Sequence, residues 1–191
     1  MSSYAWSRTD SGSESSAHSV AVLLPGAGYT AQAPLLCWCA EMLTELGWHV
    51  QAVEWTIHDS AGNDPRTFVE QAVAEAFDSA PRASRRLIVA KSFGTHALSW
   101  ARRAGIPGVW LTPILTNDAV RQALLGASSA DLAIGGEADE LWLPEKVAGT
   151  DARLISVPEA NHSLTIAGNW RRSLAIQNEI FIDIAGHLES M

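Results

Sequence analysis

The sequence predicts an α/β fold, a three-layer αβα sandwich built around a mostly parallel sheet of about six strands. Short runs of consecutive apolar residues alternate with longer segments of helical spacing along the chain. Continuous apolar runs fit strands that helices bury on both faces, as in parallel sheets. With 191 residues, 47% hydrophobic and 18% charged, the chain can form one domain with one hydrophobic core.

The first half of the chain supplies three of the expected strands. Gly47 ends the first helical pattern, and Asp64 followed by Pro65 is typical of an N-cap with proline at the first helical position. The expected strands are residues 20–24 (VAVLL), 49–55 (HVQAVEW) and 86–90 (RLIVA), and the expected helices are residues 34–46 and 67–79.

The second half continues the alternation. A helix after the third strand should end before Gly105, since glycine favours helix ends. The expected strands are residues 108–111 (GVWL), 131–135 (DLAIG) and 153–157 (RLISV), and the expected helices are residues 93–104, 117–125 and about 173–187. In a parallel α/β sheet, ligands and catalytic groups gather at the carboxyl ends of the strands, so the turns after these strands are the places to search.

Composition and the chain ends exclude several classes of protein. The formal net charge is −8, which argues against a nucleic-acid partner or an anionic membrane surface. Residues 1–19 are polar and rich in serine, so we expect a flexible tail before a single domain over residues 20–191. No apolar run approaches the roughly 20 residues that span a bilayer, so we expect no membrane insertion and a cytoplasmic location.

The cysteines and tryptophans carry less information. Cys37 and Cys39 lie two residues apart on an expected helix and point to different faces, so we expect free thiols and no metal site. The chain has 8 Trp but only 4 Phe and 2 Tyr. Because a buried indole N–H needs an acceptor, this bias favours pockets and half-polar positions.

The turn after the third strand carries the most specific motif, Ala90-Lys91-Ser92-Phe93-Gly94. A small residue two positions before and after a serine, between a strand and a helix, is typical of a nucleophile elbow. The pattern resembles the α/β-hydrolase superfamily, whose usual motif is G-x-S-x-G, with alanine here in place of the first glycine. A serine that only caps the following helix is the structural alternative.

A serine nucleophile needs a base and an acid. His162 follows the last expected strand, where the superfamily carries its catalytic histidine. Asp139, in Gly136-Glu137-Ala138-Asp139 after the fifth expected strand, resembles the position of the superfamily's acid, and Asp118 is the rival. The order Ser92, Asp139, His162 is the superfamily order.

The loop after the first strand, Pro25-Gly26-Ala27-Gly28, corresponds in this resemblance to the oxyanion loop. The backbone amides of Ala27 and Phe93 would then form the oxyanion hole.

Two other interpretations stay open. The segment from Gly26 to Ala31 also fits G-x-G-x-x-A, and Glu54 ends the next strand, as in Rossmann-like nucleotide-binding proteins. Against this, Pro34 suggests a helix that begins after the glycines rather than within them. The third possibility is a catalytically inactive hydrolase fold used for binding.

The resemblance implies a small, lidless, dienelactone-hydrolase-like member of the superfamily, because the short segments after Ser92 leave no room for a cap domain. It implies a serine hydrolase that cleaves a carboxylic ester or thioester of a small molecule, without a metal or organic cofactor, and a homodimer is an allowed assembly. The residues expected to line the substrate pocket are Gly26, Gly28, Tyr29, Lys91, Trp55, Trp142 and Trp170.

Overall fold

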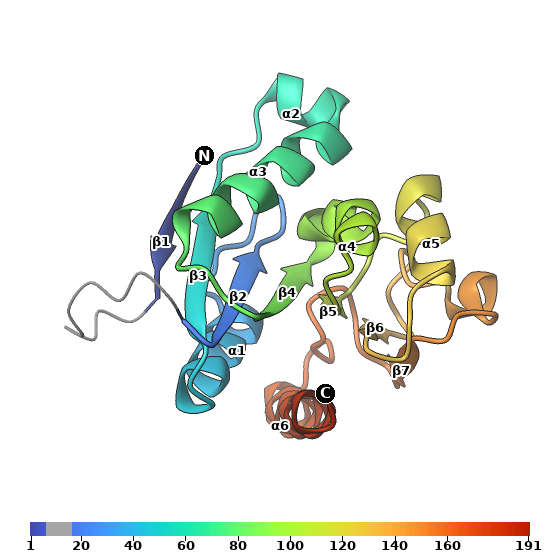
Figure 1. Ribbon diagram of the computed structural model, residues 1–191. Helices are drawn as coiled ribbons and strands as arrows, with labels where there is room; N and C mark the ends of the chain where they lie inside the picture. Colours follow the sequence, from blue (N-terminus) through green and yellow to red (C-terminus); the bar gives the residue numbers. More distant parts are fainter. Residues whose placement is uncertain (7–16) are drawn as a thin grey trace.

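The computed structural model describes residues 1–6 and 17–191, which form an open seven-stranded sheet with helices on both faces (Figure 1). The strands are β1 (Ser2–Ala5), β2 (Ser19–Leu24), β3 (His49–Glu54), β4 (Arg85–Lys91), β5 (Gly108–Leu111), β6 (Leu132–Gly136) and β7 (Arg153–Val157), in the order β1-β3-β2-β4-β5-β6-β7. Only the pairing of β1 with β3 is antiparallel in the part of the chain described. The predicted three-layer α/β sandwich with a mostly parallel sheet is confirmed.

The helices divide between the two faces of the sheet. They are α1 (Pro34–Glu45), α2 (Asp59–Asn63), α3 (Pro65–Ser79), α4 (Leu98–Ala104), α5 (Asp118–Leu125) and α6 (Trp170–Glu189), with the 3₁₀ helices η1 (Ser92–Ala97) and η2 (Pro144–Val147). Helices α1 and α6 pack on one face, and α3, α4 and α5 cover the other (Figure 1). Each face has its own cluster of buried apolar side chains, so the sheet is the middle layer of the core.

A buried carboxylate joins the amino ends of β5 and β6. Asp131, directly before β6, accepts hydrogen bonds at Oδ1 from the Gly108 amide and from Nε1 of Trp110, both at 3.0 Å. Its Oδ2 accepts a bond from the Ser128 amide at 3.0 Å. Trp110 is fully buried, and its indole N–H therefore has the acceptor that burial requires.

The sequence-based expectation and the structure differ at the first residues of the chain. Residues 1–19 were expected to be a flexible tail, but Ser2–Ala5 form β1 along the outer edge of β3. The side chain of Gln51 donates to Oγ of Ser3 at 2.9 Å, and the Trp6 amide donates to the carbonyl of Val50 at 2.9 Å. Residues 7–16 of the expected tail lie outside the described residues.

The remaining differences are local. The helix expected over residues 93–104 is divided into η1 and α4, and the short helices α2 and η2 were not expected. The connection from β5 to α5 covers only residues 112–117, so no cap domain is inserted there.

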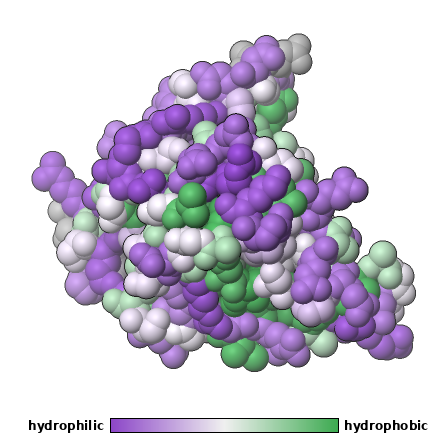
Figure 2. All heavy atoms as spheres, turned by 90° about the vertical axis from the view of Figure 1, so that its right-hand side faces the viewer, coloured by the Kyte–Doolittle hydropathy of each residue, from purple (hydrophilic) through white to green (hydrophobic). Residues whose placement is uncertain are grey.

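The side of the molecule near α5 and β7 is mostly hydrophilic, with a strip of hydrophobic residues in its lower half (Figure 2). None of the helices in the described segments is both long and apolar enough to cross a bilayer.

Candidate active site

Ser92 lies at the sharp turn between β4 and η1, with a backbone φ of 50°. A positive φ is unfavourable for a residue with a side chain, so the surrounding structure must hold the turn in place. Two residues later, a Cβ atom added at Gly94 would lie 2.5 Å from the carbonyl oxygen of Leu24. Only glycine fits at this distance, because the turn crosses the end of β2 so closely. The geometry is that of a nucleophile elbow.

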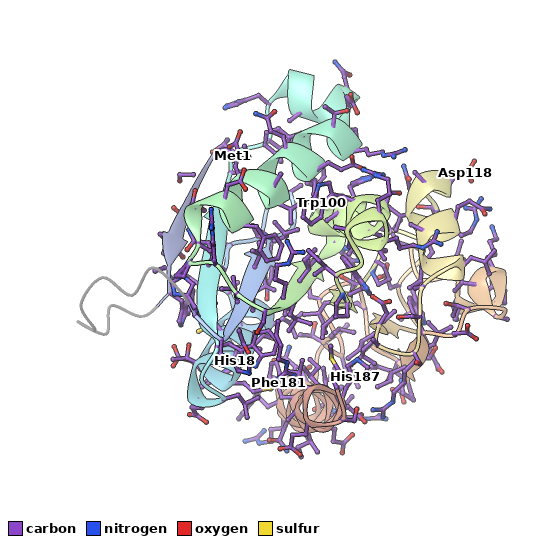
Figure 3. The ribbon with its side chains drawn as sticks, viewed as in Figure 1. Met1, His18, Trp100, Asp118, Phe181 and His187 are labelled. Carbon is purple, nitrogen blue, oxygen red and sulfur yellow. The ribbon has the colours of Figure 1, made fainter. Side chains whose placement is uncertain are left out.

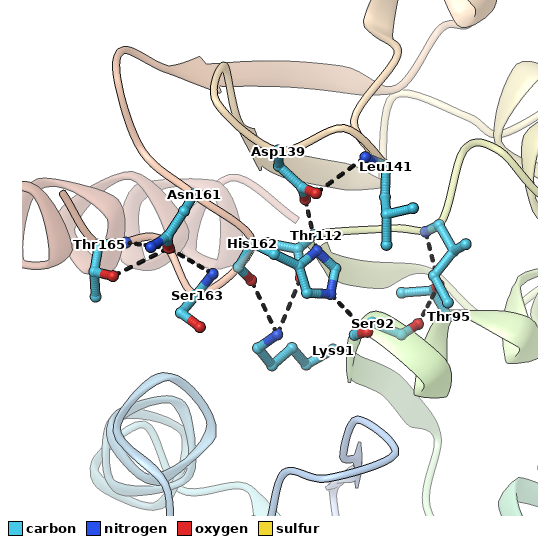
Figure 4. Close-up of polar contacts among 11 residues, drawn as sticks. Lys91, Ser92, Thr95, Thr112, Asp139, Leu141, Asn161, His162, Ser163 and Thr165 are labelled. Atoms are coloured by element: carbon cyan, nitrogen blue, oxygen red, sulfur yellow. Dashed lines mark hydrogen bonds and ion pairs between the residues drawn. The ribbon is translucent and has the colours of Figure 1, made fainter. Parts of the chain in front are cut away.

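The side chains of Ser92, His162 and Asp139 form one hydrogen-bonded chain (Figure 4). Oγ of Ser92 lies 2.8 Å from Nε2 of His162, and Nδ1 of His162 lies 2.6 Å from Oδ2 of Asp139. The carboxylate accepts a hydrogen bond from Nδ1–H, which leaves Nε2 of the neutral ring free to accept the serine proton. The Asp139 side chain is 3% exposed and that of His162 is 34% exposed. The acid is therefore buried in the interior, whereas the histidine can be reached from solvent.

Local turns hold the acid and the base in position. The other carboxylate oxygen of Asp139, Oδ1, accepts a hydrogen bond from the Leu141 amide at 3.0 Å. Beside the histidine, Oδ1 of Asn161 accepts bonds from the amides of Ser163 and Thr165, at 2.8 and 3.2 Å (Figure 4). Both turns are closed by side-chain bonds to the backbone, which fixes the ends of the Asp139–His162 pair.

The rival acid lies elsewhere. Asp118 begins α5 and points to the outside of the molecule (Figure 3). Its side chain is 85% exposed and forms an ion pair with Arg121 of the same helix. The structure therefore brings Asp139, and not Asp118, to His162.

The loop after β2 lies directly against the nucleophile. A Cβ atom added at Gly26 would lie 3.4 Å from Cβ of Ser92. The Gly26 carbonyl accepts a hydrogen bond from Nε1 of Trp55 at 3.2 Å and a longer one from the Tyr29 amide at 3.4 Å. In a trans peptide the C=O and N–H point in opposite directions, so these bonds also fix the direction of the Ala27 N–H. That amide donates no hydrogen bond to another described residue.

Aromatic rings support this loop and the elbow. The Trp55 ring lies 5.6 Å from the ring of Phe68 and 5.8 Å from that of Phe93, measured between centroids. The Phe93 ring in turn contacts His96 in an edge-to-face arrangement at 5.5 Å. Burial lowers the pKa of His96 below its ordinary value, so this ring is neutral and serves as part of the packing.

Lys91 is buried beneath the site. Its ammonium group donates to the carbonyl oxygen of His162 at 3.1 Å and to Oγ1 of Thr112 at 3.2 Å (Figure 4). It also lies 4.9 Å from the centre of the Tyr29 ring. Burial lowers the pKa of Lys91 to about 8, and the nearby Asp139 carboxylate opposes this shift.

Solved structures of other proteins identify the fold of this chain. No protein-family model and no curated protein sequence matches the chain. A lidless α/β serine hydrolase from Xanthomonas campestris matches at a TM-score of 0.61 and 18% identity, over 92% of this chain and 81% of its own. An esterase from Pyrococcus furiosus matches at 0.67 and 15%, over 92% and 83%, and an α/β serine hydrolase homologue from Coxiella burnetii at 0.65 and 16%, over 89% and 85%. The chain has the α/β-hydrolase fold.

The α/β-hydrolase fold separates this chain from the dinucleotide-binding alternative. Counted from β2 and leaving out β1, the strand order is 2-1-3-4-5-6, whereas the Rossmann order is 3-2-1-4-5-6. Helix α1 begins at Pro34, several residues after the glycines, so its first amides do not belong to the Gly26–Gly28 loop. No cluster of three or more His, Cys, Asp or Glu side chains with the spacing of a metal site occurs within residues 1–6 and 17–191.

Some of the residues expected to line a substrate pocket line a cavity, and others do not. A cavity of about 340 Å³ beside the Gly26 loop is lined by Met1, Ser2, Pro25, Tyr29, Thr30, Glu54, Trp55 and Thr56. Tyr29 and Trp55 thus line a cavity. Trp142 is instead buried, with Nε1 donating to Oγ of Ser156 at 2.9 Å, and Trp170 is 62% exposed at the start of α6.

Proposed function

We propose that this protein is a serine hydrolase that cleaves a carboxylic ester or thioester of a small molecule through an acyl-enzyme on Ser92. The observation that carries the proposal is the hydrogen-bonded chain from Ser92 through His162 to the buried Asp139. A serine at a strained, accessible turn with an oriented base is the arrangement that acyl transfer requires. Solved structures of the same fold include serine hydrolases and an esterase.

The reaction follows from the two distances. As Oγ of Ser92 attacks the substrate carbonyl, Nε2 of His162 takes the hydroxyl proton. The resulting imidazolium donates from Nδ1 to Asp139, which stabilises the positive charge. His162 then protonates the leaving alcohol or thiol, and the acyl group stays on Ser92. Water, deprotonated by the same nitrogen, releases the acid and restores the serine.

The negative charge on the carbonyl oxygen needs donors. The backbone amides of Ala27 and Phe93 are proposed for this role. The Ala27 amide is oriented by the Trp55–Gly26 bond, and the Phe93 amide follows the nucleophile at the first turn of η1. One such donor contributes roughly 10²- to 10³-fold in rate. Residues of this chain and water carry out every proton transfer and both nucleophilic attacks, so the proposed mechanism uses no cofactor.

The cavity beside the Gly26 loop is the proposed position of part of the substrate. Its lining offers the rings of Tyr29 and Trp55 and the hydroxyls of Ser2, Thr30 and Thr56. The Lys91 side chain does not join them, because its ammonium is bound in the interior. A cytoplasmic location and a homodimer stay predictions.

Labelling with a fluorophosphonate tests the proposal, since this reagent reacts with activated serines. We expect the wild type to be labelled, Ser92→Ala to lose the label, and Ser99→Ala on α4 to keep it. On p-nitrophenyl acetate and on an acetyl thioester, Ser92→Ala and His162→Gln should each lose about 10³-fold or more in kcat. Equal labelling of wild type and Ser92→Ala would refute the proposal. No labelling of a folded wild type would favour the inactive, binding form of the fold.

A further inference from the structure

Lys91 occupies a position where a charged side chain is rarely found. It directly precedes Ser92, and the residue is only 3% exposed. Burial of an ammonium group is unfavourable unless each of its protons has a partner. The chain has only one other lysine, Lys146, which is exposed. A buried lysine beside the nucleophile therefore calls for a physical explanation.

The ammonium connects three segments that are distant in sequence. It donates one hydrogen bond to the carbonyl of His162 in the loop after β7 and one to Oγ1 of Thr112 after β5. The face of the Tyr29 ring, from the loop after β2, lies 4.9 Å away, within the range of a cation–π contact. The bond to His162 is made to the backbone of the residue that serves as the base. The charge of Lys91 is thus compensated by groups of the site itself.

The charge of Lys91 acts on the titration of the site. The groups that face it are the hydroxyl of Thr112, the ring of Tyr29, His162 and the carboxylate of Asp139. The Asp139 carboxylate favours the charged form of Lys91, and it also accepts a hydrogen bond from the His162 ring. The ammonium is bound to the backbone of the residue that carries the imidazole, so a proton on the ring would place a second positive charge in the same part of the site. Asp139 therefore faces two groups, the Lys91 amine and the His162 ring, that can each carry a positive charge.

We propose that Lys91 is a positioning residue that anchors the backbone of His162 and keeps its ring neutral in the resting site. The kinetic part of this inference rests on the proposed function, whereas the anchoring and the effect on His162 do not. A neutral imidazole is the form that can accept the Ser92 proton. Lys91 would then widen the pH range, on its acidic side, over which His162 can act as a base.

Nuclear magnetic resonance on the full chain tests the inference without any assay of activity. The imidazole of His162, assigned with His162→Gln, is titrated in the wild type, in Lys91→Met and in Lys91→Arg. We expect the titration of His162 to move to higher pH in Lys91→Met, because this variant removes a positive charge from the site. Lys91→Arg, which keeps the charge, should stay near the wild type. Lys146→Met is the matched control and should leave the titration unchanged.

A measurement on the wild type covers the case in which Lys91→Met does not fold. With ¹⁵N-labelled lysine only two side-chain signals are expected, one for each lysine of the chain. The Lys91 ammonium should exchange its protons slowly, because two of them are hydrogen bonded in the interior, and Lys146 should exchange rapidly. Two equally fast signals would overturn the proposed anchoring.

Kinetics then separate this inference from the proposed function. If the wild type hydrolyses esters, the acidic limb of the kcat/KM profile in Lys91→Met should move to higher pH by the same interval as the His162 titration. An unchanged His162 titration in folded Lys91→Met refutes the role of Lys91 even if the enzyme is active. Absence of fluorophosphonate labelling in the folded wild type refutes the proposed hydrolase activity. The titration of His162 then remains as the test of the role of Lys91.

Discussion

The indole of Trp55 provides the most informative single substitution. Trp55→Phe removes the N–H that donates to the Gly26 carbonyl at 3.2 Å and keeps an aromatic ring beside Phe68 and Phe93. The only other bond recorded at this carbonyl among the described residues comes from the Tyr29 amide, at the long distance of 3.4 Å. The peptide between Gly26 and Ala27 should therefore lose much of its restraint.

The magnitude follows from two limits. A net hydrogen bond contributes about 1 kcal/mol, which corresponds to about a fivefold change in the population of the bonded orientation. Complete loss of one oxyanion-hole donor costs roughly 10²- to 10³-fold in kcat. We therefore expect kcat of Trp55→Phe to fall by about 5- to 100-fold. KM should change little, because the amide matters most when the oxygen carries negative charge.

The assay is the acylation rate with p-nitrophenyl acetate, together with the affinity for a boronic acid that imitates the tetrahedral intermediate. In Trp55→Phe the acylation rate and the affinity for the boronic acid should both fall. Phe68→Leu is the matched control. It alters the same aromatic cluster, whereas the hydrogen bond to the Gly26 carbonyl comes from Trp55 and stays in place. An acylation rate in folded Trp55→Phe equal to that of the wild type would refute the role of this bond.

Three further predictions concern stability and can be measured by urea unfolding followed by circular dichroism. Gly94→Ala places a Cβ atom 2.5 Å from the Leu24 carbonyl oxygen, so the free energy of unfolding should fall by about 1–3 kcal/mol; an unchanged midpoint would mean that the turn can move away from β2. Asp131→Ala leaves the buried indole N–H of Trp110 without its acceptor, and we expect a loss of about 2–4 kcal/mol, whereas a loss below 1 kcal/mol would contradict the anchoring role. Lys91 has a folded-state pKa of about 8 against an ordinary 10.5, so the unfolded chain binds more protons between these values and the wild type should gain stability as pH rises from 8 to 10.5. Relative to Lys91→Met this gain should approach about 3 kcal/mol, and a constant difference across that range would show that the Lys91 pKa is ordinary.

The strands that carry the site could be predicted because they are buried on both faces. All six strands expected from apolar runs are present, with boundaries that differ by at most one residue. Strand β1 could not be predicted, since Ser2–Ala5 is short and polar and is stabilised by the free edge of β3 rather than by its own pattern.

The positions of Ser92, Asp139 and His162 follow from chain order at one edge of the sheet, which the sequence does reveal. What Lys91, Trp55 and Trp142 contact depends on side-chain direction. Lys91 and Trp142 point into the interior, and the Trp55 indole reaches a carbonyl 29 positions away in the chain. A residue's place beside a motif does not determine where its polar atoms lie. The usable signal for Lys91 was a lysine within an otherwise apolar strand end.

The left-handed backbone positions of residues other than glycine have an evolutionary consequence. In the described chain these are Ser92, Thr112, Glu159 and Leu164, and all four follow the carboxyl ends of β4, β5 or β7. Each such position costs on the order of 1–3 kcal/mol. Selection for thermal robustness alone would replace them with glycine, beginning at Ser92 itself. The rim of the site is therefore where stability and chemistry compete, and stabilising substitutions that preserve activity should be sought in the two apolar layers instead.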